Sequence, residues 1–150
     1  MSIIIRPAMP SDAFEIVEML KDFAGEGGKS VSVGSKEVCE WLESEVIYGL
    51  IAEVGGEVTA MAVYYYGIST FRGTKNLFVE DLFVKREFRR RHIGSALYRK
   101  LVEIAKTHSS STIRWLIRTH NTRANEWYKS IAGDVDVDWG VYQMNVISGK

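Results

Sequence analysis

The 150-residue chain has one cysteine, two prolines and no excess charge of either sign. Cys39 alone cannot form an internal disulfide bond, so we expect a protein of the reducing cytoplasm. Lys and Arg number 19, as do Asp and Glu, so no overall field attracts nucleic acid or a membrane. We expect neither a signal peptide nor a membrane span, because no apolar run is long enough. Any anion site must therefore come from local clustering of basic residues.

What the chain does contain is a succession of short elements that alternate in type. Period-2 and period-3.6 apolar patterns predict strands over Ile3–Ile5, Leu50–Val54, Val58–Tyr66, Leu77–Val84, Ile113–Ile117 and Val141–Ile147. They predict helices from Asp12, from Ser35, over Gly94–Lys106 and over Arg123–Ile131. The order favours one α/β domain over residues 1–150, with helices on both faces of a mixed sheet.

Two local signals support this assignment. Asp12 followed three residues later by Glu15 predicts a capping box at the start of the first helix. Gly55 and Gly56 between two strand-like runs predict a two-residue β-hairpin.

A basic loop joins the strand that ends at Val84 to the helix that begins near Gly94. It contains Lys85, Arg86, Arg89, Arg90, Arg91 and His92. A helix N-terminus offers unpaired N–H groups and a positive dipole end, and no acidic residue occupies the first turn of this helix. These features predict a phosphate site. A solvated basic loop and a nucleic-acid-binding patch are alternative interpretations of the same cluster.

The loop sequence FVKREFRRRHIGSAL resembles motif A of the GNAT acetyltransferases, R/Q-x-x-G-x-G/A after a strand. Arg89 matches the first position and Gly94 the last, whereas His92 stands where the family has its middle glycine. The resemblance implies that the pyrophosphate of acetyl-CoA is held by Arg89, Arg90, Arg91, His92, Ile93, Gly94 and Ser95. Because glycine allows close backbone approach, His92 must turn outward or donate to a phosphate, or else CoA binding is weakened.

Two carboxylates, Glu80 and Asp81, lie in the middle of the predicted strand Leu77–Val84. Regular alternation would place Glu80 on one face with Leu82 and Asp81 on the other. If helices cover both faces, each carboxylate needs a charged partner or a raised pKa. We expect Asp81 to pair with an arginine, and Glu80 to be functional.

The segment YYYGISTFRGTKNLFVEDLFV resembles the diamine acetyltransferase branch of this family, the spermidine/spermine type. Glu80 aligns with the carboxylate that accepts the proton of the substrate amine. The resemblance covers nearly the whole chain and is weakest over Gly25–Tyr48.

The run HNTRANEWYKSIAG resembles the N-x-x-A-x-x-x-Y segment of the family. It implies that Asn121 and Ala124 lie beside the pantetheine arm and that Tyr128 protonates the departing thiolate. A phenol with a pKa near 10 keeps the required proton at neutral pH. The alternative is that Tyr128 belongs to the core face of a helix. Asp136 or Asp138 could hold a distal ammonium of the substrate, or could form a solvated acidic turn.

The resemblance implies a GNAT fold, with six to seven mostly antiparallel strands and a splayed strand pair that holds acetyl-CoA. Backbone groups of Leu82, Phe83 and Val84 would pair with the pantetheine. The expected activity is direct acetyl transfer to a primary amine of a small molecule, without a metal, in a homodimer. The alternatives are a protein or peptide acceptor, and a non-catalytic acyl-CoA-binding protein.

Overall fold

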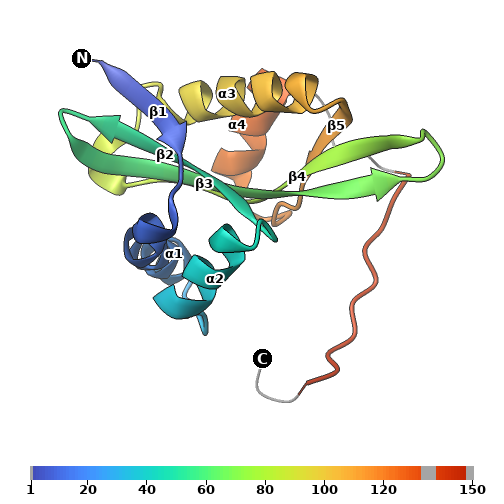
Figure 1. Cartoon of the computed structure of the whole chain (residues 1–150), viewed down its shortest axis with the longest axis horizontal. Helices are drawn as coiled ribbons and strands as arrows, with labels where there is room; N and C mark the ends of the chain where they lie inside the picture. Colours follow the sequence, from blue (N-terminus) through green and yellow to red (C-terminus); the bar gives the residue numbers. More distant parts are fainter. Residues whose placement is uncertain (1, 133–137, 148–150) are drawn as a thin grey trace. The chain divides into compact units, whose positions relative to one another are not determined.

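The computed structural model describes residues 2–132 and 138–147, in two compact units, Met1–Leu116 and Ile117–Lys150. The first unit contains a five-stranded sheet in the order β1-β2-β3-β4-β5 (Figure 1). Its strands are β1 (Ile3–Pro7), β2 (Tyr48–Val54), β3 (Glu57–Ser69), β4 (Thr74–Val84) and β5 (Ser110–Trp115). The pairs β1–β2, β2–β3 and β3–β4 are antiparallel, and β5 runs parallel to β4.

Helices cover both faces of this sheet, as the sequence predicted (Figure 1). The helical elements are η1 (Pro10–Asp12), α1 (Ala13–Glu26), α2 (Ser35–Glu43), η2 (Arg86–Phe88) and α3 (Ile93–Thr107), with α4 (Thr122–Ala132) in the second unit. On one face Leu97 and Leu101 of α3 pack against the sheet, and on the other face Ile16 and Met19 of α1 do so. Within the described part of the chain, no helix is long and apolar enough to span a membrane.

The sheet has fewer strands than the six to seven expected. Residues 141–147 were predicted as a final strand, but the structure shows no strand there and leaves their apolar side chains exposed. A strand exists only where its N–H and C=O groups find a neighbouring strand, and alternating apolar residues cannot supply that neighbour.

The capping box predicted at the start of α1 is replaced by a different network. Asp12 makes no side-chain bond to the helix that follows; its Oδ2 accepts the Met9 backbone N–H at 2.7 Å. Arg6 donates to both carboxylate oxygens of Asp12, at 2.8 and 2.9 Å, and to Glu53 at 2.8 Å. Arg6 holds the pKa of Asp12 below its ordinary value and ties β1 and β2 to η1, which leads into α1.

The predicted hairpin between β2 and β3 is confirmed. Gly55 and Gly56 have φ of 60° and 81° between the paired residues Val54 and Glu57. Two successive positive φ angles define a turn whose twist matches the flanking strands.

Candidate active site

A β-bulge interrupts β4 at Glu80. Val63 of β3 pairs with Asp81 and the next residue, Tyr64, pairs with Val79, so Glu80 has no partner in the register. An inserted residue reverses the alternation that follows it. Leu77 and Val79 face the α3 side before the bulge, whereas Leu82 and Val84 face it afterwards. Regular alternation along Leu77–Val84 was therefore the wrong assumption.

The bulge coincides with the point at which β4 and β5 separate. The parallel pairing runs from Lys75 opposite Ser110 to Val79 opposite Trp115 and does not continue among the described residues. Beyond Val79, the edge of β4 that faces β5 has no strand partner in the first unit. Leu82, Phe83 and Val84 lie on this open edge, where an extended amide-containing chain could pair as a strand does.

The two carboxylates at the bulge lie in different environments. Glu80 is exposed, whereas Asp81 is half-buried. Burial, and then the nearby charge of Glu80, raises the pKa of Asp81 from 3.8 to about 6. Among the residues described, the Asp81 side chain has no arginine partner and makes no hydrogen bond, so the expected structural ion pair is wrong.

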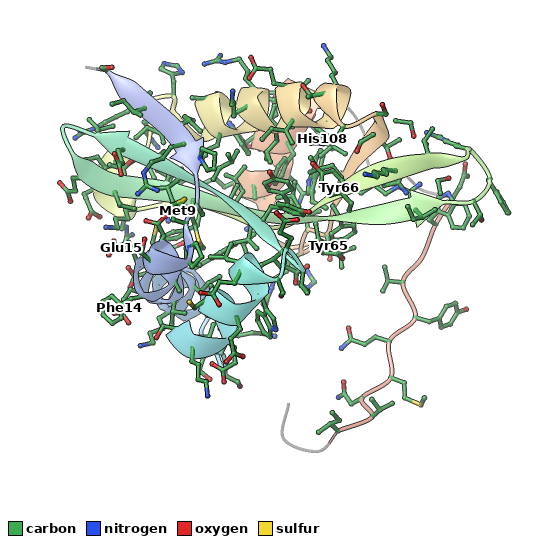
Figure 2. All side chains as sticks on the ribbon, viewed as in Figure 1. Met9, Phe14, Glu15, Tyr65, Tyr66 and His108 are labelled. Atoms are coloured by element: carbon green, nitrogen blue, oxygen red, sulfur yellow. The ribbon has the colours of Figure 1, made fainter. Side chains whose placement is uncertain are left out.

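Aromatic rings flank the carboxylates on the same side of the sheet. Tyr65 stacks on Phe78 with ring centroids 5.1 Å apart. Burial, followed by the charge of Glu80, raises the pKa of Tyr65 above its ordinary value. Tyr65 and Tyr66 project to opposite faces of the sheet, and Tyr66 contacts His108 at the end of α3 (Figure 2). The face that carries Tyr65 therefore presents acidic and aromatic groups together, a combination suited to a cationic ligand.

The basic loop before α3 forms a cradle of backbone N–H groups. Arg90 and His92 have φ of 62° and 61°, so both are in the left-handed region. Within the described residues, no N–H of residues 90–95 donates to a backbone or side-chain acceptor. No acidic side chain occupies the first turn of α3, and Ile93 anchors that turn in the core. Alternating left-handed residues and a helix N-terminus produce an anion-binding concavity.

His92 takes the conformation that glycine would take at its position. The residue is exposed, and its side chain makes no capping hydrogen bond to α3. A left-handed non-glycine residue costs about 1–2 kcal/mol. The loop thus keeps the backbone conformation of a glycine-containing motif, although His92 is strained in it.

Arg89 braces this loop rather than projecting from it. Its Nε donates to the Val84 carbonyl at 2.9 Å, and its guanidinium forms an ion pair with Glu26 of α1. The guanidinium carbon also lies 5.4 Å from the ring centroid of Phe83. Arg90 and Arg91 are exposed, and Arg91 lies over the ring of Phe88 at 5.2 Å. Two arginines of the cluster thus remain at the surface of the cradle.

The second unit holds the remaining predicted residues. The Asn121 side chain accepts the Ala124 N–H at 3.2 Å, so it caps α4. Tyr128 of α4 is half-buried, and burial raises its pKa to about 12. It therefore holds its proton firmly at neutral pH. Asp138 is exposed in a turn, and Asp136 lies outside the described residues. No group of His, Cys, Asp and Glu in the described ranges could hold a metal ion.

Residues 15–133 match the acetyltransferase (GNAT) family. The chain belongs to this family. A thialysine N-epsilon-acetyltransferase of Caenorhabditis elegans is 30% identical over 124 residues, covering 81% of this chain and 77% of the relative. A Bos taurus protein of the same name is 28% identical over 141 residues, covering 86% of this chain and 82% of the relative. Membership of the family makes the chain an N-acetyltransferase and implies acetyl-CoA as its cosubstrate.

Solved structures with similar folds include other acetyltransferases. A probable acetyltransferase superposes with a TM-score of 0.84 at 17% identity, covering 98% of this chain and 99% of the other. A ribosomal-protein-alanine N-acetyltransferase from Brucella melitensis gives 0.77 at 21% identity, covering 96% and 99%. At these identities the likeness shows a shared GNAT fold.

The first unit fits acetyl-CoA on its own geometry. The N–H groups of residues 90–95 and the exposed Arg90 and Arg91 suit a pyrophosphate. The open edge of β4 suits the pantetheine amides. The motif made both features predictable. The sequence did not reveal Asp81 as a functional candidate, because its environment depends on the bulge at Glu80. Only the pairing of β3 with β4, in which Glu80 has no partner, reveals that bulge.

Proposed function

We propose that this protein acetylates a primary amine of a small diamine, polyamine or lysine-like amino acid, with acetyl-CoA as donor. The observation that carries the proposal is the β4 bulge, where two adjacent carboxylates border the open strand edge. Asp81 is half-buried without a cationic partner among the described residues, so a substrate ammonium would offset the cost of its charge. Two of the relatives are named thialysine N-epsilon-acetyltransferases, and the substrate in that name is an amine of this class.

Glu80 is the proposed general base. It accepts a proton from the substrate ammonium, which leaves a neutral amine to attack the thioester carbonyl carbon. The nitrogen of the resulting tetrahedral intermediate releases its second proton to solvent. As the C–S bond breaks, Tyr128 gives its phenolic proton to the thiolate and later regains one from solvent. A backbone N–H of Leu82 or Phe83 on the open edge stabilises the oxyanion, a contribution of about 3 kcal/mol in comparable sites.

The cosubstrate roles follow the motif. Arg89, Arg90, Arg91, His92, Ile93, Gly94 and Ser95 form the pyrophosphate loop in this proposal, with Arg89 acting through the loop it braces. Asn121 and Ala124 flank the pantetheine arm, and Asp136 or Asp138 holds a distal ammonium. The protein acts as a cytoplasmic homodimer, without a metal, a nucleic acid or a membrane as partner.

The first test is a thermal-shift titration with acetyl-CoA. A ligand at 100 times its Kd stabilises the folded state by about 2.7 kcal/mol, so a clear rise in Tm is expected. No rise at saturating acetyl-CoA would contradict the proposal at its first step.

The second test is an acceptor panel of diamines, thialysine, free amino acids and peptides, with CoA release as the readout. We expect turnover of small diamines or thialysine and a loss of about 100-fold or more in kcat for Glu80→Gln. The matched control is Glu57→Gln, an exposed glutamate at the start of β3. Turnover of peptides alone would identify a protein acetyltransferase. Acetyl-CoA binding without any turnover would identify an acyl-CoA-binding protein.

A further inference from the structure

Arg114 lies on β5 beside the point at which β5 separates from β4. It is opposite Phe78, one residue before the parallel pairing ends. The Thr112 hydroxyl donates to Asn76 Oδ1 at 2.6 Å, so these two side chains share a face of the sheet. Residues two apart along a strand point to the same face, which places Arg114 with Thr112 and Phe78 with Asn76. Arg114 and Phe78 therefore lie on one face of the sheet.

This face carries three kinds of chemical group. Tyr65 of β3, Phe78 of β4 and Arg114 of β5 form a row across the sheet, since Phe78 pairs with both of the others. The rings of Tyr65 and Phe78 stack on each other. Glu80 and Asp81 lie farther along β4, and burial, followed by the charge of Glu80, raises the pKa of Tyr65. The stacked rings thus border a cation on one side and carboxylates on another.

The Arg114 guanidinium is available to a ligand. Arg114 is exposed, and its side chain has no ion pair or hydrogen bond within residues 2–132 and 138–147. Strand geometry puts its Cα about 8 Å from that of Glu80, from two steps of about 3.4 Å along β4 and a strand spacing of about 4.8 Å. The two side chains are not paired with each other, so each can hold a different end of one bound molecule. A guanidinium matches a carboxylate through two parallel hydrogen bonds.

We propose that Arg114 binds a carboxylate of the acceptor and makes a lysine-like amino acid the preferred acceptor over a diamine or polyamine. The inference rests on the proposed function, in which Glu80 takes a proton from the reacting ammonium. The methylene chain of the amino acid would pack on Phe78, with its ammonium at Glu80 and its carboxylate at Arg114. The carboxylate would also supply the charge partner that Arg114 lacks in the described part of the chain.

The same arginine disfavours the competing acceptors. A diamine or polyamine of similar length brings a second ammonium to the place of the carboxylate, where it meets the guanidinium. Like charges repel, so Arg114 attracts one class of amine and opposes the other. Arg114 lies away from the reacting nitrogen and takes no part in the proton transfers. Its loss should therefore change KM for the acceptor more than kcat.

The test compares acceptors that differ at the carboxylate, using the full chain with acetyl-CoA and CoA release as the readout. Cadaverine is lysine without its carboxylate, and lysine amide and thialysine amide keep every amine but lose the negative charge. Lysine should exceed lysine amide and cadaverine about tenfold or more in kcat/KM, and thialysine should exceed its amide similarly, as expected for a charge-assisted contact.

Substitution of Arg114 tests whether this residue causes the preference. Arg114→Gln should raise KM for lysine about tenfold or more and leave KM for cadaverine no higher than in the native chain. Arg114→Lys keeps the charge and should retain part of the preference. Arg114→Glu should reverse it, so that cadaverine becomes the better acceptor. The matched control is Arg99→Gln, which removes an exposed arginine from α3 on the other face and should change neither KM.

Equal kcat/KM for lysine and cadaverine in the native chain would overturn the inference, and so would a KM for lysine that Arg114→Gln leaves unchanged. A folded Arg114→Gln chain that loses the acetyl-CoA thermal shift would also overturn it, because Arg114 would then serve the cosubstrate. Equal turnover of lysine and cadaverine refutes the role of Arg114 alone and leaves the proposed function standing. Absence of turnover with every acceptor refutes both.

Discussion

Replacing Asp81 with asparagine is expected to stabilise the folded protein above pH 6. Burial and the charge of Glu80 raise the pKa of Asp81 from 3.8 to about 6. A raised folded-state pKa means that the carboxyl contributes most to stability when protonated. That contribution is fully present below about pH 4 and is lost as the pH rises through 6. At 1.36 kcal/mol per pH unit, the loss is about 3 kcal/mol.

The asparagine variant removes this dependence. At pH 7.5 its free energy of unfolding should exceed that of the native chain by at most about 3 kcal/mol, and less if the new amide N–H groups lack partners. For a chain of this size the gain corresponds to a rise in Tm of roughly 6–12 °C. At pH 4 the two proteins should be equally stable, because the native carboxyl is then protonated.

Urea unfolding at several pH values from 4 to 7.5 measures the effect. Asp22→Asn is the matched control, since Asp22 is exposed on α1 and should give no change in the pH profile. Glu80→Gln should lower the midpoint of the profile only modestly, because burial is the larger cause of the shift and the Glu80 charge the smaller. A destabilised Asp81→Asn chain at pH 7.5 that keeps the native pH profile would refute the reasoning.

Three further changes test the loop and the second unit. His92→Val should destabilise the chain by about 1–2 kcal/mol and weaken acetyl-CoA binding, because a β-branched residue tolerates φ of 61° poorly. His92→Gly should preserve the stability of the chain and its acetyl-CoA binding. Denaturant unfolding measures the stability, and the thermal shift measures the binding. Tyr128→Phe should lower kcat about 100-fold and leave the acetyl-CoA thermal shift unchanged, and a full kcat would remove Tyr128 from the mechanism. Glu26→Gln should cost under about 1 kcal/mol, less at high salt, because its ion pair with Arg89 is partly exposed; a larger loss in urea unfolding would show that this pair holds the loop.

The sequence alone determined the features that depend on local chemistry. Two glycines between strand-like runs predict a tight hairpin, because such a turn needs positive φ at both positions and glycine adopts it readily. Gly55 and Gly56 both have positive φ in the structure. The basic loop and the acid-free first turn of α3 predict an anion cradle, because unpaired N–H groups belong to any helix N-terminus. The order of the elements predicted helices on both faces of a mixed sheet, and the packing of α3 on one face and of α1 and α2 on the other confirms this prediction.

Only the tertiary structure decided the features that depend on distant partners. Asp12 turns back to Arg6, which also donates to Glu53, and Arg89 pairs with Glu26, 63 positions away. The bulge at Glu80 is a property of the pairing of β4 with β3, and it moves Asp81 into a half-buried position without a cationic partner among the described residues. Residues 141–147 alternate like a strand, but the structure assigns no strand to them. Register and pairing are set by residues far apart in the chain, so local pattern could indicate the carboxylates of the site but not their environments.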